Sequence, residues 1–92
     1  MKILIVDDHA LIREALRGLL KKLKRGSRVL EAADGRQAAE VIAAHPDVNL
    51  ILLDLSLPDR DGLQLLAELR ERHPGTAIVV MSANQSLSLI HI

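Results

Sequence analysis

The chain has 92 residues, of which 12 are basic and 12 acidic, so its formal net charge is zero. This length suits a single domain, and the balanced charge excludes a general electrostatic attraction to nucleic acid or to an anionic membrane. Phe, Tyr, Trp and Cys are all absent, which excludes aromatic base-stacking platforms, disulfides and thiolate metal sites.

The N-terminal segment resembles the start of a signal peptide only briefly. Its apolar run MKILIV ends at Asp7 and Asp8, which is too early for a signal-peptide core. No stretch of the sequence is long and apolar enough to cross a bilayer. Together with the absence of Cys, this leads us to expect a cytoplasmic domain with no membrane partner.

Short apolar runs alternate with helical patterns in the first half of the chain. Residues 2–6 (KILIV) predict a strand buried on both faces, because the run is apolar without alternation. Apolar residues then recur at helical spacing and predict a helix over about residues 10–24, which ends before Gly26. Residues 28–32 (RVLEA) predict a second strand, and residues 35–44 predict a helix that ends before Pro46.

The second half repeats this alternation. Residues 50–55 (LILLDL) predict a third buried strand, and a turn through Pro58 and Gly62 leads into a helix over residues 63–72. Residues 77–82 (AIVVMS) predict a fourth strand. Strands that alternate with helices are typical of an α/β fold with a parallel sheet and crossover helices.

Acidic residues stand where the predicted strands end. Asp7 and Asp8 follow the first strand, Asp54 lies at the end of the third, and Ser82 ends the fourth. Ligands of parallel sheets bind beyond these carboxyl ends, where two like charges about 4 Å apart repel by about 4 kcal/mol at an effective dielectric of 20. Mg²⁺ offsets such repulsion and prefers carboxylate and carbonyl oxygens. The alternative is that each Asp only caps a helix, but the coincidence of three with a hydroxyl favours a metal-assisted site.

A carboxylate beside a divalent cation can act as a nucleophile and form an aspartyl phosphate. The motifs VDDH at 6–9, LLDLSLPDRDG at 52–62 and VVMSA at 79–83 resemble the receiver domain of two-component response regulators, in particular receivers attached to helix-turn-helix transcription regulators. The resemblance extends over about residues 2–84. It implies a flavodoxin-like doubly wound parallel sheet with strand order 2-1-3-4-5.

The resemblance also implies the roles of individual residues. Asp54 matches the phosphoacceptor, Asp7 and Asp8 match the acidic pair that holds Mg²⁺, and Ser56 matches the position whose backbone carbonyl completes the protein ligands of the metal. Ser82 matches the switch residue that hydrogen-bonds the phosphoryl group. The implied partner is a sensor histidine kinase, and DNA would be contacted only through an output domain that this chain lacks.

The same residues allow other interpretations. A phosphohydrolase of the haloacid dehalogenase type also uses Mg²⁺ and an Asp nucleophile, but it carries D-x-D on the first strand, whereas this chain has adjacent Asp7 and Asp8. A third possibility is a receiver-like module that binds partners without phosphorylation. Residues 57–68 resemble a calcium loop that lacks its first ligand. His9 is expected to be a loop residue near the helix start rather than a ligand.

A complete receiver continues after its fourth strand with a helix, a fifth strand and a final helix. We therefore expect a partial receiver domain over residues 1–85, truncated after the fourth strand (order 2-1-3-4), with that strand as an open edge and without full switch function. No Lys follows Lys24, so the Lys that reaches the phosphoryl group in receivers is not present. Residues 86–92 are expected to be a non-native tail, since residues 87–92 match one reading frame of the transposon-end adaptor CTGTCTCTTATACACATCT. The alternative is that the rough alternation of SLSLIHI forms a strand along the exposed edge of the fourth strand.

Overall fold

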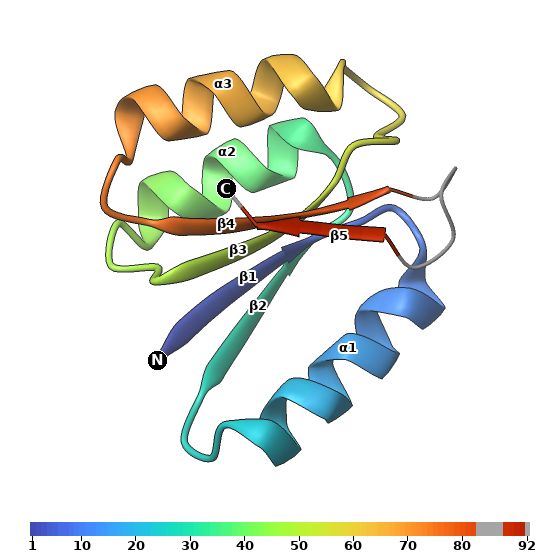
Figure 1. Ribbon diagram of the computed structural model, residues 1–92, viewed down its shortest axis with the longest axis vertical. Coiled ribbons are helices and arrows are strands. Elements are labelled where there is room, and N and C mark those ends of the chain that lie inside the picture. The colour runs from blue at the N-terminus through green and yellow to red at the C-terminus, as the bar shows by residue number, and fades with distance from the viewer. Residues whose placement is uncertain (83–87, 92) are drawn as a thin grey trace.

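The computed structural model describes residues 1–82 and 88–91, and it describes side-chain surroundings as far as Met81. Strands and helices alternate along the chain (Figure 1), in the order β1 (Lys2–Val6), α1 (Ala10–Leu23), β2 (Arg28–Ala32), α2 (Gly35–Ala44), β3 (Leu50–Asp54), α3 (Gly62–Arg72), β4 (Ala77–Ser82) and β5 (Ser88–His91). The boundaries agree with the predicted ones to within one residue. The helix α1 ends at Leu23, and Gly26 follows with a φ of 81°, a left-handed conformation that favours glycine after a helix.

The sheet has the order β2-β1-β3-β4-β5. Its first four strands are parallel, which confirms the predicted doubly wound fold and the order 2-1-3-4. The register aligns Val6 with Leu53 and Asp54 with Met81. The carboxyl ends of the two central strands therefore lie side by side.

The predicted open edge at the fourth strand is wrong. The strand β5 pairs with β4 in antiparallel orientation, with Ser88 opposite Ser82 and His91 opposite Val79. An uncovered edge strand presents a row of unpaired N–H and C=O groups, which a following segment can satisfy. The expected boundary between residues 85 and 86 lies outside the described residues, and the non-native origin of residues 86–92 stays a prediction.

Helices cover both faces of the sheet, with α2 and α3 on one face and α1 on the other (Figure 1). The larger core lies under α2 and α3, where Ala38, Ile42, Leu65 and Leu69 pack against the strands. A smaller cluster of Ile5, Val29 and Leu52 lies on the face of α1. The central strands β1 and β3 are buried over most of their length, as their unbroken apolar runs predict.

The helix α1 packs less deeply than the other two. None of its residues is fully buried, and Leu16 and Leu20 are only partly covered. Leu19 and Leu23 are exposed by 51% and 73%, so its apolar stripe extends beyond the sheet surface that it covers. Among the described helices, none combines the length and the apolar character that a membrane span requires.

Candidate functional site

The acidic residues meet at the carboxyl edge of the sheet. Because Val6 and Leu53 are aligned, the residues that follow β1 come next to Asp54 at the end of β3. Asp7 and Asp54 are the two charged residues that the described core buries, with exposures of 4% and 2%. Carboxylate oxygens of Asp7, Asp8 and Asp54 and a ring nitrogen of His9 all lie within 4.8 Å of one another.

The loop between β1 and α1 fixes the first acidic residue. The Asp7 carboxylate accepts a hydrogen bond of 2.8 Å from the backbone N–H of His9, and the Asp7 backbone N–H donates to the carbonyl of Ala32. From α1, Nη1 of Arg13 donates to the Asp7 carbonyl at 2.6 Å. Asp8 is an exposed residue, so the pair offers one buried and one more accessible carboxylate.

Asp54 is held by the backbone that follows it. Its Oδ1 accepts a hydrogen bond of 3.0 Å from the Ser56 N–H. Burial raises the pKa of the Asp54 carboxyl above its ordinary value, the hydrogen bond from Ser56 opposes this rise, and the charges of Asp7 and Asp8 add to it. The ionised Asp54 is therefore in an unfavourable environment that a cation would relieve.

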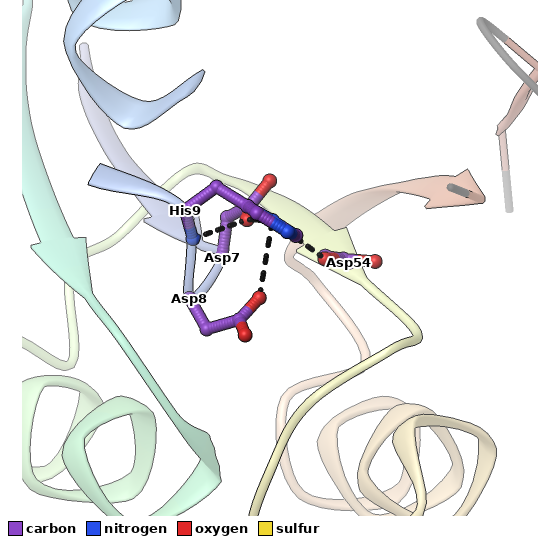
Figure 2. A group of neighbouring side chains, drawn as sticks. All are labelled: Asp7, Asp8, His9 and Asp54. Atoms are coloured by element: carbon purple, nitrogen blue, oxygen red, sulfur yellow. Dashed lines mark hydrogen bonds and ion pairs between the residues drawn. The ribbon is translucent and has the colours of Figure 1, made fainter. Parts of the chain in front are cut away.

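His9 lies at the start of α1, as expected, and its ring also joins this acidic group. It is the N-cap of α1 without a side-chain capping hydrogen bond, and Figure 2 shows its ring directed toward the carboxylates. Its Nδ1 lies 2.7 Å from Oδ1 of Asp7 and 3.1 Å from Oδ1 of Asp8. The hydrogen bond to Asp7, followed by the charge of Asp8, raises the pKa of His9. Sequence spacing does not reveal this orientation; only the adjacency to the acidic pair hints at it.

The residues that resemble a calcium loop lie in the loop between β3 and α3, and their carboxylates bind backbone N–H groups at the starts of helices. Asp61 caps α3 by accepting from the Leu63 N–H, and Asp59 accepts from the N–H groups of Gly35 and Arg36 at the start of α2. Both carboxylates therefore serve helix N-termini. The hydrogen bond from Gly35 is the main cause that lowers the pKa of Asp59.

Gly62 allows this loop to pass close behind the phosphoacceptor candidate. A Cβ at position 62 would lie 2.3 Å from the backbone oxygen of Leu55 and 2.5 Å from its Cα. No side chain fits at these distances from backbone atoms. The short path from β3 back to α3, predicted from Pro58 and Gly62, therefore depends on glycine.

The chemistry of the group suits a hard divalent cation. Three carboxylates supply oxygen ligands of the kind that Mg²⁺ prefers, and Mg²⁺ usually completes its octahedron with waters. Ser56 lies two residues after Asp54, and its backbone N–H donates to the Asp54 carboxylate. Ser82 ends β4 one residue after Met81, which is aligned with Asp54, while the Ser82 side chain lies outside the described part of the structure.

Comparison with known proteins identifies the family of the chain. The family described as "Response regulator receiver domain" matches residues 3–91. The chain belongs to this receiver family. It is thus a receiver domain of the two-component response regulators, and the resemblance carried by the VDDH and LLDLSLPDRDG motifs is confirmed.

Curated relatives of this receiver are named as an activator and a response regulator. The glycerol metabolism activator of Pseudomonas putida is 42% identical over 89 residues, which cover 97% of this chain and 40% of the relative. The nitrate/nitrite response regulator protein NarL of Escherichia coli K12 is 39% identical over 82 residues, which cover 89% of this chain and 38% of the relative. The chain thus spans about 40% of the length of these relatives.

Solved receivers share the fold. The response regulator TrrA from Thermotoga maritima, solved in complex with Mg²⁺ and BeF, superposes with a TM-score of 0.80 at 29% identity, covering 89% of this chain and 69% of that chain. A two-component response regulator of the LuxR family from Aurantimonas gives a TM-score of 0.76 at 28% identity, covering 88% of this chain and 57% of that chain.

Proposed function

We propose that this receiver takes a phosphoryl group from the phosphohistidine of a sensor histidine kinase onto Asp54, with Mg²⁺ held by Asp7, Asp8, Asp54 and the carbonyl of Ser56. The observation that carries the proposal is the burial of Asp54, which is 2% exposed and stands beside two further carboxylates. A buried, charge-crowded carboxylate is costly as a purely structural feature. Its raised pKa is typical of a functional group.

The two carboxylate oxygens of Asp54 would have different roles. One oxygen would hold the cation while the other attacks phosphorus, and the Ser56 N–H that donates to Oδ1 keeps the carboxylate oriented. A P–O bond to the attacking oxygen forms while the P–N bond of the phosphohistidine breaks, and the leaving imidazole nitrogen keeps the electron pair. Mg²⁺ supplies neutralisation of the charge shared by the carboxylate and the phosphoryl oxygens. We assign to the Ser82 hydroxyl a hydrogen bond to a phosphoryl oxygen.

The proposed partners follow from this reaction. The donor is a sensor histidine kinase, and DNA is contacted only through an output domain, because relatives named as transcriptional regulatory proteins are longer than this chain. Because we propose phosphotransfer that controls transcription, we also propose that the receiver acts in the cytoplasm. We propose no contact with a membrane.

Intact-mass measurement with a small phosphodonor tests the proposal. We expect phosphoramidate and Mg²⁺ to add one phosphoryl group to the wild type, and EDTA to abolish the addition. Asp54→Asn should remove it, whereas Asp47→Asn, at an exposed carboxylate that pairs with Lys2, should retain it. Phosphorylation of Asp54→Asn, or none of the wild type, would contradict the proposal. No phosphorylation together with no metal binding would favour the interaction module, and turnover of phosphomonoesters would favour the hydrolase.

A further inference from the structure

The His9 ring brings a nitrogen atom into a group of oxygen ligands. Its Nδ1 lies 2.7 Å from Asp7 Oδ1, 3.1 Å from Asp8 Oδ1 and 3.9 Å from Asp54 Oδ2. Figure 2 shows the ring turned toward these carboxylates rather than along α1. The ring thus faces two carboxylates of the loop after β1 and one at the end of β3.

These separations resemble the spacing of ligands around one metal ion. Two ligands each about 2.1 Å from a metal are about 3.0 Å apart when adjacent in an octahedron and about 4.2 Å apart when opposite. The distances from Nδ1 to Asp7 and Asp8 agree with adjacent positions, and the distance to Asp54 lies near the opposite position. Asp8 and His9 are the exposed members of the group, so their side chains can adjust around an ion while Asp7 and Asp54 stay fixed.

We propose that His9 is a nitrogen ligand of the metal site and shifts its preference from Mg²⁺ toward Co²⁺, Ni²⁺ and Zn²⁺. The proposal rests on the metal site of the proposed function. Imidazole suits these first-row ions, whereas Mg²⁺ favours oxygen ligands. On binding, the metal takes the place of the proton through which Nδ1 contacts Asp7.

The position of His9 in the fold leaves its ring free for this role. The residue is the N-cap of α1, but its side chain makes no capping hydrogen bond. Its side chain is 56% exposed, so the ring is not needed to fill the core. Asn is a favoured N-cap residue, so His9→Asn should keep the helix while replacing the nitrogen ligand by an amide.

Metal titration of the full chain tests the proposal. Co²⁺ binding is followed by its visible absorption bands and Mg²⁺ binding by calorimetry, at about pH 8, where His is normally neutral. The proteins are the wild type, His9→Ala, His9→Asn and the control His73→Gln, at the C-cap of α3. Thermal unfolding checks that each variant is folded.

We expect both His9 variants to lose about tenfold or more in Co²⁺ affinity, while their Mg²⁺ affinity stays within about twofold of the wild type. His73→Gln should bind both ions like the wild type. Paramagnetically shifted ring protons of His9 in the Co²⁺-loaded wild type would support direct ligation.

Four outcomes would overturn the inference: no Co²⁺ binding by the wild type, unchanged Co²⁺ affinity in the His9 variants, an equal loss for both ions, or tighter binding of both ions. The last would mean that His9 competes with the cation for the carboxylates. The proposed function fails separately, if Asp54→Asn still accepts a phosphoryl group, and this result does not depend on His9.

Discussion

At the scale of single residues, Arg13 links the acidic pair to the body of the domain. Its Nη1 donates to the carbonyl of Asp7, and its Nε donates to Oε1 of Glu31 at 3.0 Å. Arg17 binds the other oxygen of Glu31, and no hydrogen bond joins it to Asp7 among those of the described residues. The two arginines therefore share one partner, and Arg13 alone of the two holds the loop that carries the metal-site residues.

This difference predicts that Arg13→Gln weakens Mg²⁺ binding by about tenfold, a loss typical of residues that orient metal ligands. Arg17→Gln is the matched control, because it also loses a contact with Glu31 but leaves Asp7 in place. Calorimetric titration with Mg²⁺ measures both. Equal affinities of the two variants would show that the contact with the Asp7 carbonyl does not matter.

The residues of the site were predictable to different degrees. Asp7, Asp8 and Asp54 could be placed together from the sequence, because the carboxyl ends of neighbouring parallel strands meet at one edge. The direction of the His9 ring could not, since the rotamer of a half-exposed side chain depends on its neighbours in space. The contact of Asp59 with the start of α2 was also hidden, because it joins residues 24 positions apart.

At the scale of elements, α1 depends on charged contacts more than α2 and α3 do. It buries no residue completely, and Arg13 and Arg17 join it to Glu31 of β2. Burial raises the pKa of Glu31, but the hydrogen bonds from Arg17 and Arg13 together outweigh this, so the pKa lies below its ordinary value.

The lowered pKa of Glu31 determines how the free energy of unfolding changes with pH. A carboxyl group with a lower pKa in the folded state stabilises the fold above its unfolded pKa, about 4.3 for Glu, and this contribution is lost as the pH falls through the folded pKa. Glu31→Gln should therefore lower the free energy of unfolding by about 1 kcal/mol at neutral pH, the upper range for a partly exposed ion pair.

Urea denaturation of the wild type and Glu31→Gln at about pH 7 and about pH 3 measures this effect. We expect the difference between the two proteins to shrink at the acidic pH. Glu14→Gln, at an exposed position of α1, is the control and should differ little from the wild type at either pH. A pH-independent effect of Glu31→Gln would mean that the loss is one of packing.

Each element up to β4 was predictable from local patterns, whereas β5 was only an alternative reading of the alternating tail. The runs 2–6 and 50–55 could be identified as buried strands without any tertiary information. The segment Ser88–His91 alternates apolar and polar residues, but four residues of alternation cannot specify a partner. Its pairing depends on the free edge of β4, a property of the assembled sheet.

At the scale of the whole molecule, the buried carboxylates that the site needs for its function lower the stability of the fold. Asp7 and Asp54 are buried at the centre of one sheet edge with Asp8 beside them. The raised pKa of Asp54 means that its ionised form costs stability at neutral pH: stabilisation is present while the carboxyl is protonated and is lost as the pH rises through the folded pKa.

Asp54→Asn should therefore be more stable than the wild type without metal, by about 1 kcal/mol, or about 4–8 °C in Tm for a domain of this size. Mg²⁺ should stabilise the wild type, by about 2.7 kcal/mol at a concentration of 100 times Kd, and should stabilise Asp54→Asn less. Thermal unfolding with and without Mg²⁺ measures both effects. A lower Tm of metal-free Asp54→Asn would argue that the carboxylate is structural.

The order of the strands is the part of the global fold that local patterns alone could not determine. Alternating strands and helices predict a parallel sheet, but several strand orders satisfy that pattern. The order 2-1-3-4 came from the resemblance of the motifs to receivers. The observed register confirms it and brings the VDDH motif next to Asp54.

The most direct test of the central claim is to locate the phosphoryl group. The wild type is treated with phosphoramidate and Mg²⁺, the acyl phosphate is reduced with borohydride, and fragment mass spectrometry identifies the altered residue. We predict that the modification lies at Asp54 alone. Modification at Asp7 or Asp8 instead, or at exposed carboxylates such as Asp59 to the same extent as at Asp54, would contradict the assignment of Asp54 as the phosphoacceptor.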